Sequence, residues 1–425
     1  MPGLTTRDLV EPLPSAATDR SGTDRRVVFV RYWGSHFKSR RQANNLARQF
    51  EPLVQRNWLC HLVVERLPDE QSWLEPFQAL DVRLVVLPRP GGNFDFKCVA
   101  RAYALCRRLR CSVLHCDNMH TSPLLGAFLA RVKVRIWSKR SMSAHYEQGH
   151  QPGLRERIGL ATRTSGFCAT RIFAVSREVQ KELAEMEIAQ GRVVVRHNPR
   201  TLSVERTGGD RMAVRQSMGL ADADKVVITV GHAVPVKGWD LLVRAFARVA
   251  EAEPQARLIL VGSFTAPHER ACYADLERSI AEYDVKANVT FTGHVEDIGR
   301  VLQAADMFVM PSRSEGFSLA LVEALQAGLP CIATRVGIAE DVIADGVNGF
   351  LVVRDDEGGL AKVMLRLTQD VALRKRLAQN AVAPACIPTL QEYAEKLAGD
   401  YESLLAMSAG HSRSEFKRDV YIEVQ

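Results

Sequence analysis

The chain has 425 residues, of which 46% are hydrophobic and 25% are charged, a composition typical of a globular protein with room for two domains. No apolar run reaches the roughly 18 to 20 residues that span a bilayer, and the nine cysteines form no C-x2-C pair and no His/Cys cluster at metal-ligand spacing. These features argue against a transmembrane protein and a structural zinc site, and the scattered cysteines favour a reducing, cytoplasmic location.

The net charge of +7 is unevenly divided along the chain. Residues 1–200 hold 32 Lys and Arg against 18 Asp and Glu, whereas residues 201–425 hold 24 against 31. A basic first half predicts contact with an anionic partner. Nucleic acid is not expected, because no nucleic-acid motif or aromatic platform accompanies the charge. A lipid-linked or anionic acceptor, and a peripheral position on the inner face of a membrane, are both expectations.

The first domain is predicted over residues 27–200, after a polar leader at 1–26 that lacks the apolar stretch of a secretory signal and is expected to be disordered. Short apolar runs predict strands at 27–31, 59–65, 82–87, 112–116, 134–138, 171–175 and 192–196. Helical patterns fall between them, as at 41–54 and 98–109. Such alternation predicts an α/β fold with a parallel, doubly wound sheet, whose ligands bind beyond the carboxyl ends of the strands.

Polar residues follow three of these predicted strands. They are candidates for the acceptor side of a binding cleft: His36 and Lys38 after the first strand, Asn118 after the fourth, and Lys139 and Arg140 after the fifth. His115 lies in the middle of a strand and is expected in the core. Two further segments, 99–110 and 154–171, are basic and amphipathic. They are interpreted either as solvated helix faces or as a patch for a membrane surface or an acceptor.

A linker is predicted at 201–224, where Gly and mixed polar residues follow Pro199. A second strand and helix series occupies 225–388, with strands at 225–230, 257–261, 289–292, 307–310, 331–334 and 350–353. A last helix is expected over 389–406, followed by a loose tail at 407–425.

The segment 307–330 contains the most informative pattern. An apolar strand ends at Pro311, and Ser318 is placed to cap a helix whose apolar residues recur at helical spacing until Gly328. Glu315 precedes the helix and Glu323 lies within it. The backbone amides of 317–319 would point out of the helix N-terminus, which favours phosphate. Two carboxylates around an anion site suit the hydroxyls and diphosphate of a nucleotide-sugar, although an ordinary strand-loop-helix with two solvated glutamates has the same spacing.

The amino-acid sequence of this segment resembles a known signature. Glu315-Gly-Phe-Ser-Leu-Ala-Leu-Val-Glu323, followed by Ala-Leu-Gln-Ala-Gly-Leu-Pro, is similar to the E-x7-E motif of retaining glycosyltransferases of family 4, which have the GT-B fold. The resemblance is dense from about Val226 to Val353 and sparse before it. It implies two doubly wound Rossmann-like domains that face an interdomain cleft, with the last helix crossing back to the first domain.

The resemblance also implies roles for particular residues. Glu323 would hold the ribose hydroxyls, and Glu315 would contact the donor sugar. Lys237 would hold the diphosphate and, with Glu315, would act in catalysis. The other implied donor-site residues are Gly316, Phe317, Ser318, Leu319, Gly293, Val295 and Gly34.

Three positions depart from the family pattern, one of them being Ser138-Lys139-Arg140 after the fifth strand, where many members have a histidine. Gly34 stands alone where many members have two adjacent glycines, and His232 takes the place of the arginine that precedes Lys237 in the family. A histidine carries a full charge only below its pKa of about 6.5. Three outcomes are open. The diphosphate would be bound more weakly, or Lys139 or Arg140 of the first domain would supply the missing charge, or activity would be lost.

The expected function is a retaining transfer of a sugar, a hexose in the first instance, from a nucleoside diphosphate sugar to an acceptor hydroxyl in cell-surface polysaccharide or glycolipid synthesis. No cofactor and no essential metal are expected, because no G-x-G-x-x-G or P-loop motif is present and Lys237 with the helix N-terminus would neutralise the leaving phosphate. The alternatives are a nucleotide-sugar epimerase of the same fold and a non-catalytic sugar-nucleotide-binding protein.

Overall fold

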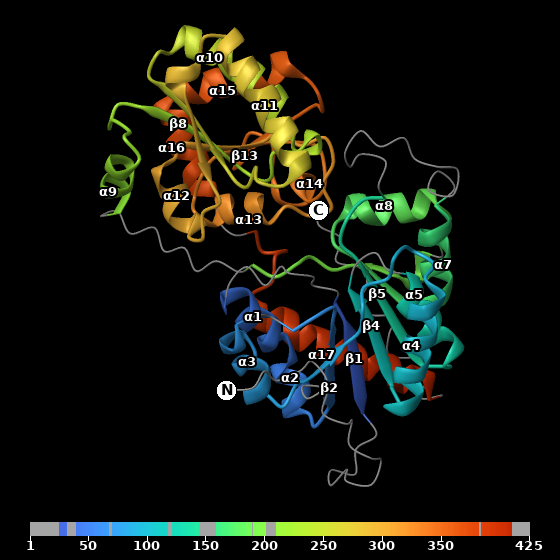
Figure 1. The fold of residues 1–425 in the computed structure, drawn as a ribbon. Coiled ribbons are helices and arrows are strands. Elements are labelled where there is room, and N and C mark those ends of the chain that lie inside the picture. Colours follow the sequence, from blue (N-terminus) through green and yellow to red (C-terminus); the bar gives the residue numbers. More distant parts are fainter. Residues whose placement is uncertain are drawn as a thin grey trace, which may run out of the picture.

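The chain folds around two parallel sheets. The computed structural model describes residues 25–31, 40–67, 70–117, 121–143, 159–188, 190–200, 210–381 and 384–409. Figure 1 shows the two sheets in separate lobes, each with helices on both faces. The predicted arrangement of two doubly wound α/β domains is therefore confirmed, and all thirteen predicted strands are present to within one residue at either end.

The first sheet has the strand order β3-β2-β1-β4-β5-β6-β7, and all of its pairs are parallel. Its strands are β1 (Arg26–Val30), β2 (Leu59–Val64), β3 (Arg83–Val86), β4 (Val113–Asp117), β5 (Val134–Lys139), β6 (Arg171–Ala174) and β7 (Val193–Val195). Its helices are α1 (Arg40–Ala47), α2 (Glu51–Gln55), α3 (Glu75–Ala79), α4 (Phe96–Arg108), α5 (Thr121–Leu129), α7 (Leu160–Cys168) and α8 (Arg177–Glu185).

Successive side chains of β1 enter different cores, because the side chains of a strand alternate between the two faces of a sheet. Val27 and Phe29 pack in the core that includes Phe50 of the segment between α1 and α2. Val28 and Val30 pack in the core that includes residues of α4, α5 and α8. Both faces of this sheet are thus covered by helices, which explains why its strands are almost continuously apolar.

The second sheet has the order β10-β9-β8-β11-β12-β13 and is also parallel. Its strands are β8 (Lys225–Val230), β9 (Ala256–Val261), β10 (Val289–Gly293), β11 (Met307–Met310), β12 (Cys331–Thr334) and β13 (Gly349–Val352). Its helices are α10 (Trp239–Ala252), α11 (Pro267–Glu282), α12 (Ile298–Ala304), α13 (Leu319–Gln326), α14 (Ala339–Val342), α15 (Glu357–Gln369) and α16 (Val371–Asn380). The strand order reverses between β8 and β11, the topological switch point at which open α/β sheets bind ligands.

Part of the predicted linker is helical. Asp210–Ser217 forms α9, and Arg211 and Arg215 of this helix both pair with Asp306 at 2.8 Å. Arg215 is buried and also donates to the carbonyl oxygens of Ala304 and Ala221. These contacts attach α9 to the second sheet. Helix α9 was not predicted, because arginines anchor it and it lacks the long apolar stripe that identifies a helix in a sequence.

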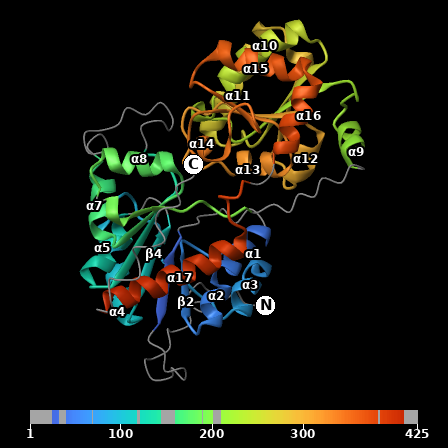
Figure 2. The same cartoon turned by 180° about the vertical axis from the view of Figure 1, so that it is seen from behind.

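The last helix, α17 (Leu390–Ser408), packs on the first domain although it follows the second in sequence. Figures 1 and 2 show it crossing the lower lobe beside α1 and α2. Thr389 caps it, and the Glu392 carboxylate accepts from the Thr389 amide at 2.7 Å. Tyr393 and Tyr401 are buried among the side chains of the first sheet.

His115 of β4 ties this helix to the sheet. Its Nδ1 lies 2.6 Å from the Tyr401 hydroxyl, and its Nε2 lies 2.7 Å from the Ser138 hydroxyl. Burial lowers the pKa of His115 to about 3, so its ring is neutral and donates at one nitrogen while accepting at the other. The prediction that His115 belongs to the core is confirmed.

Within the described residues, no helix is both long enough and apolar enough to cross a membrane. The limits of the predicted linker stay a prediction, because residues 201–209 lie outside the described part of the chain.

Replacing Tyr401 by Phe should destabilise the protein by about 1–3 kcal/mol, because it leaves the buried Nδ1 of His115 without a partner. Urea denaturation followed by circular dichroism measures the effect. Tyr283→Phe is the control, since Tyr283 is 42% exposed. Equal midpoints for the two variants would contradict the account of α17.

Candidate functional site

Lys237 and Glu315 meet at the switch point of the second sheet. Lys237 ends a single 3-10 turn after β8, and Glu315 lies in the loop after β11, a strand that pairs directly with β8. The Lys237 Nζ lies 2.7 Å from Glu315 Oε1, and the two side chains are 24% and 10% exposed. The topology therefore brings together a cation and a carboxylate that are 78 positions apart in the sequence.

The Glu315 carboxylate is held by a second donor. The Ser312 hydroxyl donates to the same Oε1 atom at 2.8 Å, and Ser312 itself is buried. Thr334 at the end of β12 donates its hydroxyl to the Ser312 carbonyl oxygen at 2.5 Å. Lys237 and Ser312 both donate to Oε1, so the orientation of the Glu315 carboxylate is fixed through one oxygen.

Arg313 joins the two loops that carry the pair. Its guanidinium binds Asp240 of α10 at 2.7 and 2.8 Å and Asp355 at 2.7 Å, and it donates to the Pro235 carbonyl oxygen at 2.7 Å. Its amide donates to the Val236 carbonyl oxygen. Hydrogen bonds to Asp240 raise the pKa of Arg313, so the guanidinium remains charged.

Helix α13 begins beside this pair. Ser318 is its N-cap, as predicted, and the Ser318 side chain accepts from the Leu321 amide at 3.4 Å. Phe317 is buried, and Leu319 is 44% exposed. Glu323 lies one turn into the helix and is half-buried. The first amides of α13 thus follow Glu315 directly, and a helix N-terminus of this kind favours an anion.

Glycines form the floor of the site at neighbouring strand ends. Gly231 follows β8, Gly262 follows β9, and Gly293 is the last residue of β10. The Gly231 amide donates to the Val261 carbonyl oxygen, and the Gly262 amide donates to the Gly293 carbonyl oxygen. A Cβ on Gly262 would lie 1.5 Å from the Gly231 carbonyl oxygen, so no larger residue fits there. Val295, two positions beyond Gly293, is partly buried against the core.

His232 is engaged by a residue that the sequence did not identify. Its Nδ1 lies 2.8 Å from Glu269 Oε1, and Glu269 Oε2 accepts from the Ser263 hydroxyl at 2.9 Å and the Ala266 amide at 3.0 Å. Burial opposes ionisation of Glu269, but these hydrogen bonds outweigh it and lower the pKa of Glu269 to about 2. His232 is thus paired with a carboxylate that stays ionised.

Two of the candidate acceptor residues have partners within the first domain. Lys139 is completely buried, and its Nζ lies 2.9 Å from Glu182 Oε2 and 2.7 Å from the Ser141 carbonyl oxygen. Arg140 binds Asp117 and Asn198. Burial opposes ionisation of Asp117, but Arg140 and Arg31 lower its pKa, so the network is charged. The side-chain charges of Lys139 and Arg140 are thus balanced by carboxylates of the first domain.

The two domains touch close to Glu315. A Cβ on Gly316 would lie 2.1 Å from the Arg140 carbonyl oxygen, which places the loop after β5 against the loop before α13. The Gly337 amide donates to the Glu178 carboxylate of α8. The His197 ring lies 6.1 Å from the Phe317 ring. The candidate site therefore opens where the domains meet.

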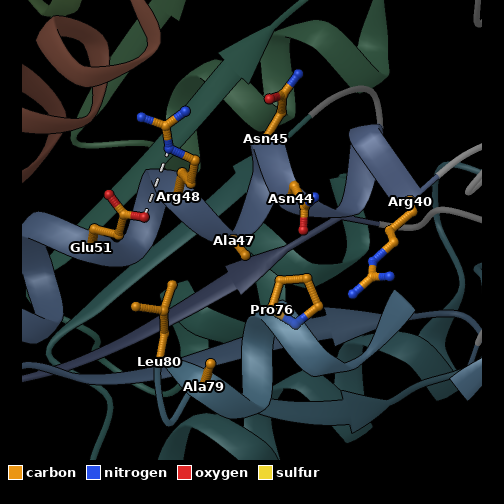
Figure 3. Close-up of a pocket in the computed structure, with 9 residues that line it drawn as sticks. All are labelled: Arg40, Asn44, Asn45, Ala47, Arg48, Glu51, Pro76, Ala79 and Leu80. Carbon is orange, nitrogen blue, oxygen red and sulfur yellow. Dashed lines mark ion pairs between the residues drawn. The ribbon is translucent and has the colours of Figure 1, made fainter. Parts of the chain in front are cut away.

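Gly34, His36, Lys38 and Asn118 fall outside the described residues. The groove in Figure 3 lies between α1 and α3 of the first domain and contains none of the candidate donor residues. Across the described ranges, no group of three or more His, Cys, Asp and Glu side chains could hold a metal ion.

Ser312, Arg313 and Glu269 were missed by sequence reasoning. Ser312 and Arg313 lie directly before Glu315, so their place in the same loop was the available signal. Glu269 gave none, because it meets His232 from 37 positions away.

Comparisons with known proteins identify a family for each of the two domains. The family model "Glycosyl transferases group 1" matches residues 210–383, and the model "Glycosyltransferase Family 4" matches residues 40–203. The two matches cover the second and first domains respectively.

Curated relatives match part of the chain. A D-inositol 3-phosphate glycosyltransferase of Stackebrandtia nassauensis is 35% identical over 205 residues, which cover 46% of this chain and 45% of that protein. An N-acetyl-alpha-D-glucosaminyl L-malate synthase of Bacillus anthracis is 28% identical over 195 residues, covering 46% and 49% respectively. The chain thus spans about half the length of the curated relatives it matches.

Solved structures match over most of the chain. The HepE protein of Anabaena, in complex with UDP and glucose, has a TM-score of 0.72 and 19% identity, and the match covers 89% of this chain and 99% of that one. At this level of identity the likeness concerns the fold, which is that of GT-B glycosyltransferases.

Replacing Glu269 by Gln should lower the free energy of unfolding by about 1–2 kcal/mol at neutral pH, because charged hydrogen bonds to Ser263, Ala266 and His232 are lost. The folded-state pKa of Glu269 is below its ordinary value of 4.5, so this stabilisation is present above pH 4.5 and disappears as the pH falls towards 2. Urea midpoints of both proteins across this range test it. Glu282→Gln, an exposed change on the same helix, is the control, and a pH-independent difference would contradict the assignment.

Proposed function

Because the chain belongs to the glycosyltransferases, with a family 4 first domain and a group 1 second domain, we propose that it transfers a sugar from a nucleoside diphosphate sugar to an acceptor hydroxyl. The observation that carries this proposal is the Lys237–Glu315 pair beside the N-terminus of α13. A cation, a row of helix amides and an oriented carboxylate suit a diphosphate with a sugar attached.

Lys237 is proposed to bind the diphosphate. Its charge is balanced by the Glu315 carboxylate at 2.7 Å. A diphosphate oxygen can replace that carboxylate as the partner of Nζ, and the first amides of α13 supply further donors. The negative charge that develops on the leaving phosphate would then be stabilised by groups already in place.

Glu315 is proposed to accept hydrogen bonds from the donor sugar. The Ser312 hydroxyl would continue to fix its Oε1 after Lys237 turns to the diphosphate. The other oxygen could then meet a sugar hydroxyl. Glu323, one turn into α13, is proposed to hold the ribose hydroxyls, and Gly293 with Val295 would line the base.

The transfer is proposed to retain the configuration of the anomeric carbon of the sugar. The acceptor oxygen forms a bond to the anomeric carbon on the face from which the phosphate oxygen departs, and the acceptor proton passes to that phosphate oxygen. The step needs no covalent enzyme intermediate and no metal. A hexose donor is the first choice, and UDP is the first nucleotide to test because HepE of similar fold was solved with UDP and glucose.

The acceptor is proposed to bind on the first domain, across the cleft from Lys237. The basic balance of residues 1–200 favours an anionic or lipid-linked acceptor, as in polysaccharide or glycolipid synthesis. A cytoplasmic position at the inner membrane face is part of the same proposal.

One observation favours a non-catalytic alternative. His232 replaces the arginine expected by family resemblance and is already paired with the ionised Glu269 carboxylate. A sugar-nucleotide-binding protein would keep the donor site without transfer. An epimerase would change the sugar and leave it attached.

Thermal denaturation with UDP, GDP, ADP and TDP tests the donor site. A nucleotide at about 100 times its dissociation constant should stabilise the protein by about 2.7 kcal/mol and raise the melting midpoint by several degrees. One nucleotide should shift the midpoint and the others should not. Glu323→Gln should reduce that shift, because the ribose loses a charged acceptor. No shift with any nucleotide would contradict the proposed function.

A further inference from the structure

Helices α4, α5 and α7 form one continuous layer on the first domain. Gly126 of α5 lies so close to α4 that a Cβ there would be 2.6 Å from the Val99 carbonyl oxygen. The Thr121 hydroxyl of α5 lies 2.9 Å from the Ser165 hydroxyl of α7. Figure 1 shows the three helices along one flank of the first sheet, and Figure 2 shows α17 on the other side.

The outer surface of this layer carries large apolar side chains. Phe96 is 81% exposed, Phe167 is 67% exposed and Leu129 is 53% exposed. Tyr103 and Leu160 are 43% and 38% exposed. We call the exposed residues of α4, α5 and α7 the α4–α5–α7 face. Large apolar side chains exposed on three adjacent helices are typical of an interaction site.

These side chains are not displaced from the core. The inward stripe of α4 is complete without them, since Cys98, Val99, Ala102, Leu105 and Cys106 are all buried. The exposed positions of α4 fall between these residues at helical spacing. The outward face of α4 therefore carries Phe96 and Tyr103 in addition to the buried stripe, and the described residues leave both side chains exposed.

The same face is strongly cationic. Residues 96–143 contain ten Lys and Arg, of which Lys139 is buried and Arg135 and Arg140 are partly buried, and only one acidic residue, Asp117, whose side chain is 2% exposed. Lys97, Arg101 and Arg107 are exposed along α4, and Arg131 and Lys133 are exposed after α5. The nearest other carboxylate, Asp95, caps α4 through the amides of Lys97 and Cys98. A merely solvated face usually mixes charges of both signs.

We propose that the α4–α5–α7 face docks on an anionic lipid bilayer. Its cations match the negative headgroups, and its protruding aromatic and leucine side chains can enter the boundary between headgroups and acyl chains. A second copy of the chain fits less well, because a two-fold dimer would place like-charged patches opposite one another. Nucleic acid fits less well because Leu129 and Leu160 provide no stacking surface.

Docking in this way would orient the cleft. Helix α4 begins after the carboxyl end of β3, so Phe96 lies at the sheet edge where ligands of such sheets bind. An acceptor held in the bilayer would then be close to the domain interface. The inference rests on the membrane position proposed above and deepens it by naming the surface that binds, and its test does not depend on the donor chemistry.

Vesicle sedimentation without nucleotide tests the proposal. The full chain should sediment with phosphatidylcholine vesicles that contain phosphatidylglycerol, should not sediment with pure phosphatidylcholine, and should dissociate as salt rises. Replacing Lys97, Arg101 and Arg107 together by Gln should weaken binding roughly a hundredfold. The double change Phe96→Ser and Phe167→Ser should weaken it about tenfold, since less apolar area enters the bilayer.

The matched control replaces Lys362, Lys375 and Arg376 by Gln, which removes the same charge from exposed positions of α15 and α16. This control should bind vesicles as the unaltered chain does, and circular dichroism should show that all variants fold. The proposal is overturned if the chain does not bind anionic vesicles, if the control loses as much binding as the α4 variant, or if the aromatic variant binds unchanged. Retention of RNA in place of vesicles would also overturn it.

Discussion

The pairing of β8 with β11 is the constraint on which the candidate site depends. Because these strands are neighbours while the strand order reverses between them, the loop that carries Lys237 and the loop that carries Glu315 open at the same sheet edge. The 2.7 Å ion pair follows from this adjacency. Helix α13 begins four residues after Glu315, so its N-terminal amides lie at the same sheet edge. The strand order thus explains why Lys237, Glu315 and the N-terminus of α13 lie together.

Close backbone packing keeps those loops together. Gly238 has a positive φ of 66°, and a Cβ there would lie 2.1 Å from the Pro311 carbonyl oxygen, so the loops after β8 and β11 touch only because this residue is glycine. Arg313 then bridges to Asp240 at the start of α10. The site is therefore supported by rigid elements on both sides, which is the condition for electrostatic stabilisation without reorganisation.

Much of this architecture could be predicted from the sequence, for identifiable reasons. The strands are buried on both faces and read as continuous apolar runs, and Ser318 signals its helix through local capping chemistry. The contacts that could not be predicted from the sequence are those set by tertiary structure. The His232–Glu269 pair joins residues 37 positions apart, and α9 is fixed by arginines on Asp306, not by an apolar stripe. Lys139, expected near a ligand, is buried on Glu182.

The central claim is that Lys237 exchanges its carboxylate partner for a donor diphosphate. Calorimetric titration of the Lys237→Gln variant with a nucleoside diphosphate and with the matching monophosphate tests this most directly, with Lys286→Gln, an exposed lysine of the same domain, as the control. The account predicts that Lys237→Gln weakens diphosphate binding by roughly tenfold to a hundredfold and leaves monophosphate binding and the control unchanged. Unchanged diphosphate affinity, or an equal loss for both nucleotides, would contradict it.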